Sequence, residues 1–212
     1  MVSEMVSMDS SLMQALGTIQ ASVDKAIANG IHMTEAMTES IVIDQMLIAL
    51  GYDLWDYQKQ GVAEGIGTIP DYTVLPKTPQ QWFLEVKKWH LPLTEKEASQ
   101  TVNYAHNQGN RWAVLTNGDE WRIYDAHSQQ PLAEKCIFTV KALSSTDAFE
   151  FFSLLTKQAM IEDHLAKSIR ERSITNIIQA ELTNINSPTI KYLRKVVDSY
   201  NGPVILIHPL RY

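Results

Sequence analysis

The sequence of 212 residues contains a single cysteine, Cys136. An intrachain disulfide framework is therefore excluded, and one cysteine cannot supply a cysteine-rich zinc site. No apolar run approaches the roughly 20 residues that a membrane helix needs. The N-terminus lacks the basic and apolar regions of a secretion signal. These absences favour a cytoplasmic protein that does not associate with a membrane.

Basic residues are also scarce: 18 Lys and Arg stand against 24 Asp and Glu, for a net charge of -6. The deficit lies in residues 1–140, which contain 9 basic and 17 acidic residues, whereas residues 141–212 contain 9 and 7. A protein that grips duplex DNA unaided usually has a basic surface. The first 140 residues therefore argue against tight, unaided DNA binding. No GxxxxGK[ST] phosphate loop is present, so we expect no ATP site.

Hydrophobic periodicity changes repeatedly along the chain. It indicates helices over residues 10–29, 34–50 and 93–107. Extended segments are expected at 52–57, 71–75, 81–87, 112–116, 121–124 and 132–140. Asn117-Gly118-Asp119-Glu120 is typical of a hairpin turn, and the glycine-rich stretch 61–67 indicates a flexible loop. This order predicts an α/β fold with a central mixed β-sheet flanked by helices.

The C-terminal third of the sequence has a different pattern of hydrophobic residues. Helical patterns predominate there, over residues 147–158, 160–180 and 188–200. The sequence therefore predicts a core domain over residues 1–142. Residues 143–212 are expected to form a helical extension that packs on the core or follows it.

A carboxylate and a lysine stand side by side at the end of one apolar segment. Glu85 and Lys87 are two residues apart, so on a strand they project from one face, while Val86 points into the core. Asp71 begins the preceding segment and converges on Glu85 if the two strands pair as a hairpin. Two carboxylates and a main-chain carbonyl suit Mg²⁺, which can activate water for phosphodiester hydrolysis. A solvated strand face is the alternative interpretation, because Glu-x-Lys triplets are common.

Six short motifs follow one another within residues 33–125. They are Thr34-Glu35-Ala36-Met37-Thr38, Ile48-Ala49-Leu50-Gly51-Tyr52-Asp53, Pro70-Asp71-Tyr72, Phe83-Leu84-Glu85-Val86-Lys87-Lys88, Gln100-Thr101-Val102-Asn103-Tyr104, and Leu115-Thr116-Asn117-Gly118 followed by Trp121 and Tyr124. In this order they resemble the N-terminal nuclease domain of the restriction subunits of type I restriction enzymes, in the PD-(D/E)xK nuclease superfamily. The resemblance implies a restriction-endonuclease-like core.

The resemblance also implies roles for Asp71, Glu85, Val86 and Lys87. Asp71 and Glu85 would bind Mg²⁺, or Mn²⁺ in its place, with the backbone carbonyl of Val86 as a further ligand. Lys87 would orient or activate the attacking water. These three side chains and Glu35 are the predicted catalytic residues.

Residues on two predicted helices complete the implied site. Glu35 would contact metal-bound water or support the site, and Glu39, one turn later, is its rival. Gln100 and Tyr104 share a helix face because they are four residues apart. That face would look toward the site, where it would contact DNA or hold the lysine. An ordinary polar helix surface remains the alternative for this pair.

The function implied by the resemblance is that of a Mg²⁺-dependent endodeoxyribonuclease domain without the helicase motor of the restriction subunits. DNA is the expected substrate, and other restriction-modification subunits are candidate partners. Two alternatives stay open. The chain could be a nuclease-fold DNA-binding or interaction module with weak or no turnover, or it could act on RNA. A homo-oligomer is compatible with either.

Overall fold

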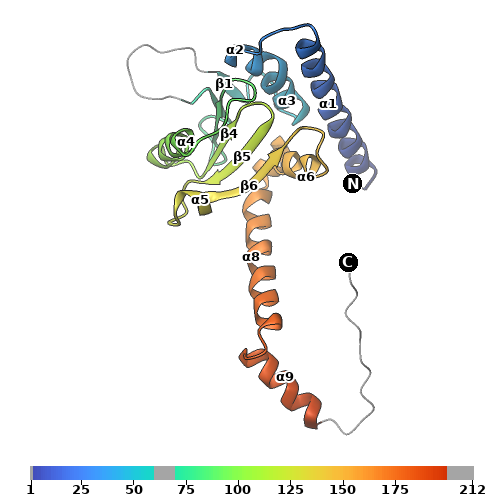
Figure 1. The fold of residues 1–212 in the computed structure, drawn as a ribbon, viewed down its shortest axis with the longest axis vertical. Coiled ribbons are helices and arrows are strands. Elements are labelled where there is room, and N and C mark those ends of the chain that lie inside the picture. The colour runs from blue at the N-terminus through green and yellow to red at the C-terminus, as the bar shows by residue number, and fades with distance from the viewer. Residues whose placement is uncertain (1, 60–69, 200–212) are drawn as a thin grey trace. The chain divides into compact units, whose positions relative to one another are not determined.

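The computed structural model describes residues 2–59 and 70–199 (Figure 1). Contacts divide the chain into two compact units, 1–165 and 166–212. The described part of the first unit contains one six-stranded sheet, made of β1 (Tyr57–Lys59), β2 (Tyr72–Val74), β3 (Trp82–Val86), β4 (Trp112–Thr116), β5 (Glu120–Asp125) and β6 (Cys136–Lys141). An α/β fold with a central sheet is therefore confirmed.

The strands lie in the sheet in their sequence order. Neighbouring strands are antiparallel except β3 and β4, which are parallel. A parallel pair needs a crossover connection, and helix α4 (Glu95–Asn107) provides it. A capping box formed by Thr94 and Glu97 starts this helix. The sheet is thus mixed, as the sequence predicts.

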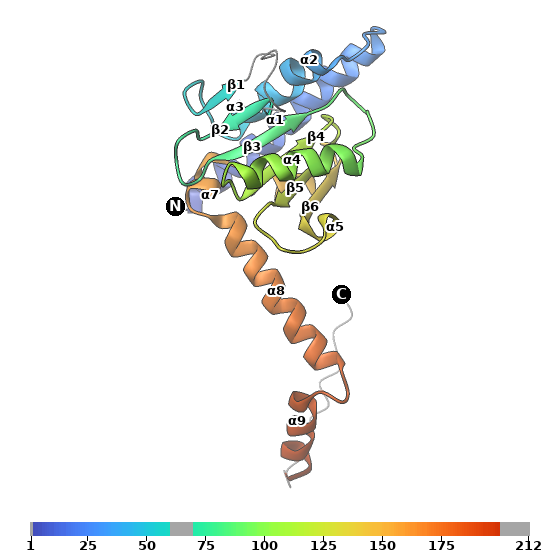
Figure 2. The same cartoon turned by 90° about the vertical axis from the view of Figure 1, so that its left-hand side faces the viewer.

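Helices cover both faces of the sheet (Figure 2). Helix α4 covers one face, where a core cluster includes Phe83, Val102 and Leu115. On the other face, Trp82 packs edge-on against Tyr52, with 6.1 Å between ring centroids. That second face is covered by helices from both ends of the unit, namely α1 (Val2–Ala28), α3 (Asp44–Ala49) and α6 (Ala148–Ser153).

The expected helix over residues 34–50 forms, but it contains an irregularity. It begins as α2 (Glu35–Thr38), with Thr34 as its N-cap: the Thr34 side chain accepts a hydrogen bond from the Met37 N–H. It continues as a π-helical segment, η1 (Glu39–Ile43), before α3. Such π turns are rare in proteins overall, but those that occur often lie at functional sites.

Two predicted strands are wrong in part. Residues 53–56 form a turn, because the carboxylates of Asp53 and Asp56 accept hydrogen bonds from the N–H groups of Trp55 and Asp53. Strand β1 begins only at Tyr57. The predicted strand 132–140 begins as a short helix, α5 (Leu132–Lys135), and becomes β6 only at Cys136. The glycine-rich stretch 61–67 lies outside the described residues.

The first unit extends past the predicted boundary at residue 142. It includes α6 and α7 (Lys157–Ile161), and α6 contacts both β6 and α1. The second unit contains most of α8 (His164–Thr183) and all of α9 (Pro188–Ser199), so the C-terminal helical character is confirmed. Among the described helices, none has the length and apolar character needed to cross a membrane.

Candidate active site

The register of β2 and β3 brings the two predicted metal-binding carboxylates together. Tyr72 pairs with Leu84 and Thr73 with Phe83. Extending this register by one residue places Asp71 opposite Glu85, where the Cβ atoms of a directly opposed pair lie about 5 Å apart on one face. The hairpin on which the sequence prediction depended is therefore present, and it positions both carboxylates at one end of the sheet.

A hydrogen bond fixes the Asp71 side chain at this position. The Val86 N–H donates to Asp71 Oδ2 over 2.6 Å. In an extended strand the N–H and C=O of one residue point the same way, toward the same neighbouring strand. The Val86 carbonyl is therefore directed toward the side on which Asp71 lies.

Lys87 is held at both its side chain and its backbone. Its Nζ lies 2.5 Å from Glu85 Oε1, and its N–H donates to the Thr116 carbonyl over 2.7 Å. Burial acts to lower the pKa of Lys87. The hydrogen bond and the charge of Glu85, with smaller contributions from Asp71 and Glu35, outweigh it and raise the pKa above its usual range. Lys87 therefore stays cationic beside the two carboxylates.

The pKa of Asp71 lies well above its usual range. Burial is the main cause and the nearby Glu85 carboxylate the second, and together they raise the pKa of Asp71 to about 7. The Val86 N–H and Lys87 act in the opposite direction, and Glu35 raises the pKa slightly. Two partly buried carboxylates that repel each other are stabilised by a bound proton or a cation. Perturbed pKa values of this kind are common at functional sites.

The electrostatic influence of Glu35 on both Asp71 and Lys87 places it beside the cluster. Its rival Glu39 is engaged elsewhere: Glu39 Oε2 lies 2.8 Å from Lys59 Nζ, which also lies 3.3 Å from Asp44 Oδ2. Glu39 is thus paired with Lys59, and Glu35 is the acidic residue of this helix whose charge acts on Asp71 and Lys87.

Gln100 and Tyr104 lie on the helix that covers this face. The Tyr104 ring packs edge-on against Phe83, with 5.0 Å between centroids. Because α4 runs opposite to β3, one helical turn back from Tyr104, about 6 Å, corresponds to about two strand residues forward from Phe83. Gln100 is therefore level with Glu85 and is exposed there. Tyr104 supports the sheet face, while Gln100 is the member of the pair that faces solvent.

Sequence reasoning missed the residues that fasten the segment after β3. The Trp89 N–H donates to the Thr38 hydroxyl over 2.9 Å, and the Asn117 side-chain amide donates to the Leu91 carbonyl over 2.9 Å. Gly118 has a positive φ of 86° and lies against the Trp89 ring. Thr38, Asn117 and Gly118 all lie within motifs that carry the resemblance, Thr34–Thr38 and Leu115–Gly118. The resemblance itself, however, implied no physical role for them.

The donor chemistry of the cluster fits a hard divalent cation in part. Within residues 2–59 and 70–199, no group of three or more His, Cys, Asp or Glu side chains is placed to hold a metal ion. The fitting donors are therefore the carboxylates of Asp71 and Glu85 and the carbonyl of Val86, with water for the rest. Mg²⁺ commonly binds in this way, through one or two carboxylates and several waters.

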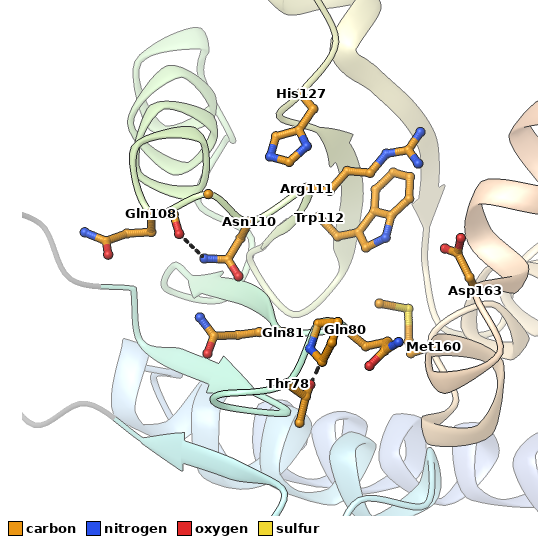
Figure 3. A pocket seen from close by; sticks show the side chains of 12 residues that line it. Thr78, Gln80, Gln81, Gln108, Asn110, Arg111, Trp112, His127, Met160 and Asp163 are labelled. Carbon is orange, nitrogen blue, oxygen red and sulfur yellow. Dashed lines mark hydrogen bonds between the residues drawn. The ribbon is translucent and has the colours of Figure 1, made fainter.

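A cavity of about 490 Å³ lies away from this cluster (Figure 3). It is lined by residues before β3, such as Gln81, and by Asn110, Arg111 and Trp112 at the beginning of β4. The carboxylate cluster lies at the opposite ends of these two strands. Arg111 covers the Trp112 ring at 4.2 Å and pairs with Asp125 at 2.9 Å, so its charge is already compensated. The cavity is not part of the candidate active site.

No protein-family model matches the chain, and no solved structure matches it significantly. The resemblance to the restriction subunits therefore rests on the sequence motifs alone.

Proposed function

We propose that this chain is a metal-dependent nuclease that hydrolyses DNA phosphodiester bonds, with a restriction-endonuclease-like core. Asp71 and Glu85 would hold Mg²⁺ together with the Val86 carbonyl. The ion, when bound, would supply an activated water and stabilise charge on the scissile phosphate. Lys87 would position the water or the phosphate oxygen, and Glu35 would accept a hydrogen bond from a water at the rim of the site.

One observation carries this proposal: two partly buried carboxylates and a lysine converge at the end of β3, with the pKa of Asp71 raised to about 7. An ordinary surface ion pair does not need two carboxylates beside one lysine. Burying the additional negative charge opposes folding. The strand order adds support, because the cluster lies at the end of β3, where the crossover through α4 to the parallel strand β4 begins.

The second candidate function is a DNA-binding or interaction module of the same fold with weak or no turnover. The acidic balance of residues 1–140 favours it, because negative charge opposes approach to a polyanion. The Lys87–Glu85 ion pair favours it as well, since metal binding must compete with it. Under this alternative a partner would supply the DNA contacts.

The proposal is tested by incubating the protein separately with plasmid DNA, single-stranded DNA and RNA. Each substrate is incubated with Mg²⁺ or Mn²⁺, and in parallel with EDTA instead. We expect metal-dependent cleavage by the wild type and a loss of about 100-fold or more in Asp71→Ala and Lys87→Ala, the usual scale for removing one preorganised electrostatic group. Lys25→Ala, an exposed lysine on α1, is the matched control and should cleave normally. Cleavage that survives both site substitutions contradicts the assignment. Cleavage of RNA alone would mean that RNA, and not DNA, is the substrate.

A further inference from the structure

Thr38 is a fully buried polar residue at the last position of α2, with 0% of its surface exposed. Its hydroxyl donates to the Thr34 carbonyl over 3.0 Å and accepts from the Trp89 N–H over 2.9 Å. The first bond is internal to the helix. The second joins residues 51 apart in the sequence, so it links the helix to the segment that follows β3.

Both ends of this link lie close along the chain to candidate site residues. Glu35 precedes Thr38 by three residues, within one helical turn, and Lys87 precedes Trp89 by two. The Lys87 backbone is itself bonded to Thr116, at the end of β4. The Thr38 hydroxyl therefore fixes the distance between two short rigid pieces of chain, one bearing Glu35 and the other Lys87.

Gly118 closes the space around this link. A Cβ atom built at Gly118 would lie 2.6 Å from the Trp89 ring and 2.8 Å from the Thr38 methyl group. Both distances are far below van der Waals contact, so the three residues pack with no room for an added methyl group. Thr38 and Trp89 cannot shift toward the turn between β4 and β5 without moving it.

We infer that Thr38 is a positioning residue, whose buried hydroxyl sets the placement of Glu35 relative to Lys87. The inference rests on the proposed function, because positioning matters only if these two side chains act on a substrate. Asp71 and Glu85 are placed by strand pairing instead. Loss of the hydroxyl should therefore disturb the reaction step and leave the two metal-binding carboxylates in place.

The test compares Thr38→Val, which keeps the shape and removes the hydroxyl, with Thr38→Ser, which keeps the hydroxyl. Thr101→Val is the matched control. Thr101 is another buried helical threonine, and its hydroxyl donates only within its own helix, to the Glu97 carbonyl over 2.9 Å. Each variant is measured for kcat and KM in Mg²⁺-dependent DNA cleavage, for Mn²⁺ affinity by calorimetry, and for amide hydrogen exchange at Trp89.

We expect Thr38→Val to lower kcat by about 10- to 100-fold, because small misplacement of catalytic groups has effects of this size. Its KM and Mn²⁺ affinity should stay within about threefold of the wild type, while the Trp89 amide exchanges at least about tenfold faster. Thr38→Ser and Thr101→Val should resemble the wild type in all four measurements.

The outcomes separate the inference from the proposed function. A wild type that cleaves no nucleic acid with either metal overturns both. A wild type that cleaves, together with a Thr38→Val variant of unchanged kcat, overturns the positioning role alone. So does a Thr38→Val variant whose Mn²⁺ affinity falls as far as its kcat, since that result means general damage to the site.

Discussion

Replacing Asp71 with asparagine should make the protein more stable at alkaline pH in the absence of metal. The amide oxygen of asparagine can still accept the 2.6 Å hydrogen bond from the Val86 N–H. The substitution removes only the negative charge, which burial and Glu85 oppose. Gains in stability on removing a charged functional group are common, because active sites are arranged for function at a cost in stability.

The size and sign of this effect follow from proton linkage. The pKa of Asp71 is about 7 in the folded protein, against 3.8 for an ordinary aspartate. The folded state therefore binds the proton more tightly, and the free energy of unfolding falls as pH rises from about 4 to about 7. About three pKa units correspond to about 4 kcal/mol at most. Partial exposure of Asp71 and screening by solvent reduce the expected effect to about 2 kcal/mol.

Urea unfolding of the wild type and Asp71→Asn, in EDTA at pH 4.5 and pH 8.5, measures this difference. The variant should gain about 2 kcal/mol relative to the wild type between the two pH values, or about 4–8 °C in Tm. Asp24→Asn on the exposed surface of α1 controls for loss of one negative charge. A variant that is no more stable than the wild type at pH 8.5 refutes the reasoning. Replacing the EDTA with Mn²⁺ should then stabilise the wild type and not the variant.

Two further comparisons test other parts of the structure. Gly118→Ala should lower the free energy of unfolding by about 3 kcal/mol, because the added methyl group meets the Trp89 ring and φ is positive. Gly109→Ala, also at positive φ but with open space around it, should cost only about 1 kcal/mol. Thermal unfolding measures both, and equal losses would contradict the packing argument. Glu35→Gln should reduce DNA cleavage about tenfold, whereas Glu39→Gln should stay within twofold of the wild type; the reverse order would exchange their roles.

Elements defined by local chemistry could be predicted from the sequence. The hairpin at Asn117-Gly118 is correct because local residues set the turn geometry: Gly118 has positive φ, and the Asn117 side chain accepts from the N–H groups of Asp119 and Glu120. The strand predicted at residues 52–57 is wrong up to Asp56 for the same kind of reason. The carboxylates of Asp53 and Asp56 accept hydrogen bonds from backbone N–H groups and so turn the chain. A pattern of alternating hydrophobic residues does not reveal these bonds.

The candidate site could be predicted only as far as strand geometry reaches. Alternation places Glu85 and Lys87 on one face, and the hairpin brings Asp71 to them. The choice between Glu35 and Glu39 depends on which acidic residue Lys59 engages, and the role of Thr38 depends on a bond across 51 residues. Neither can be read from periodicity, because both arise from tertiary packing.

The π turn between α2 and α3 has a consequence for how this chain can change over evolution. In an α-helix, residues five apart point about 140° away from each other. In η1, the Asp44 N–H bonds to the Glu39 carbonyl five residues earlier, so these two acidic residues are stacked and can share Lys59. In a regular α-helix residues four apart are also nearly stacked, about 40° apart, so deleting one residue from this segment would restore a regular helix and leave α2 at nearly the same rotation relative to α3. We therefore expect natural and engineered variants to tolerate the loss of one residue from η1, because α2 keeps its rotation relative to α3.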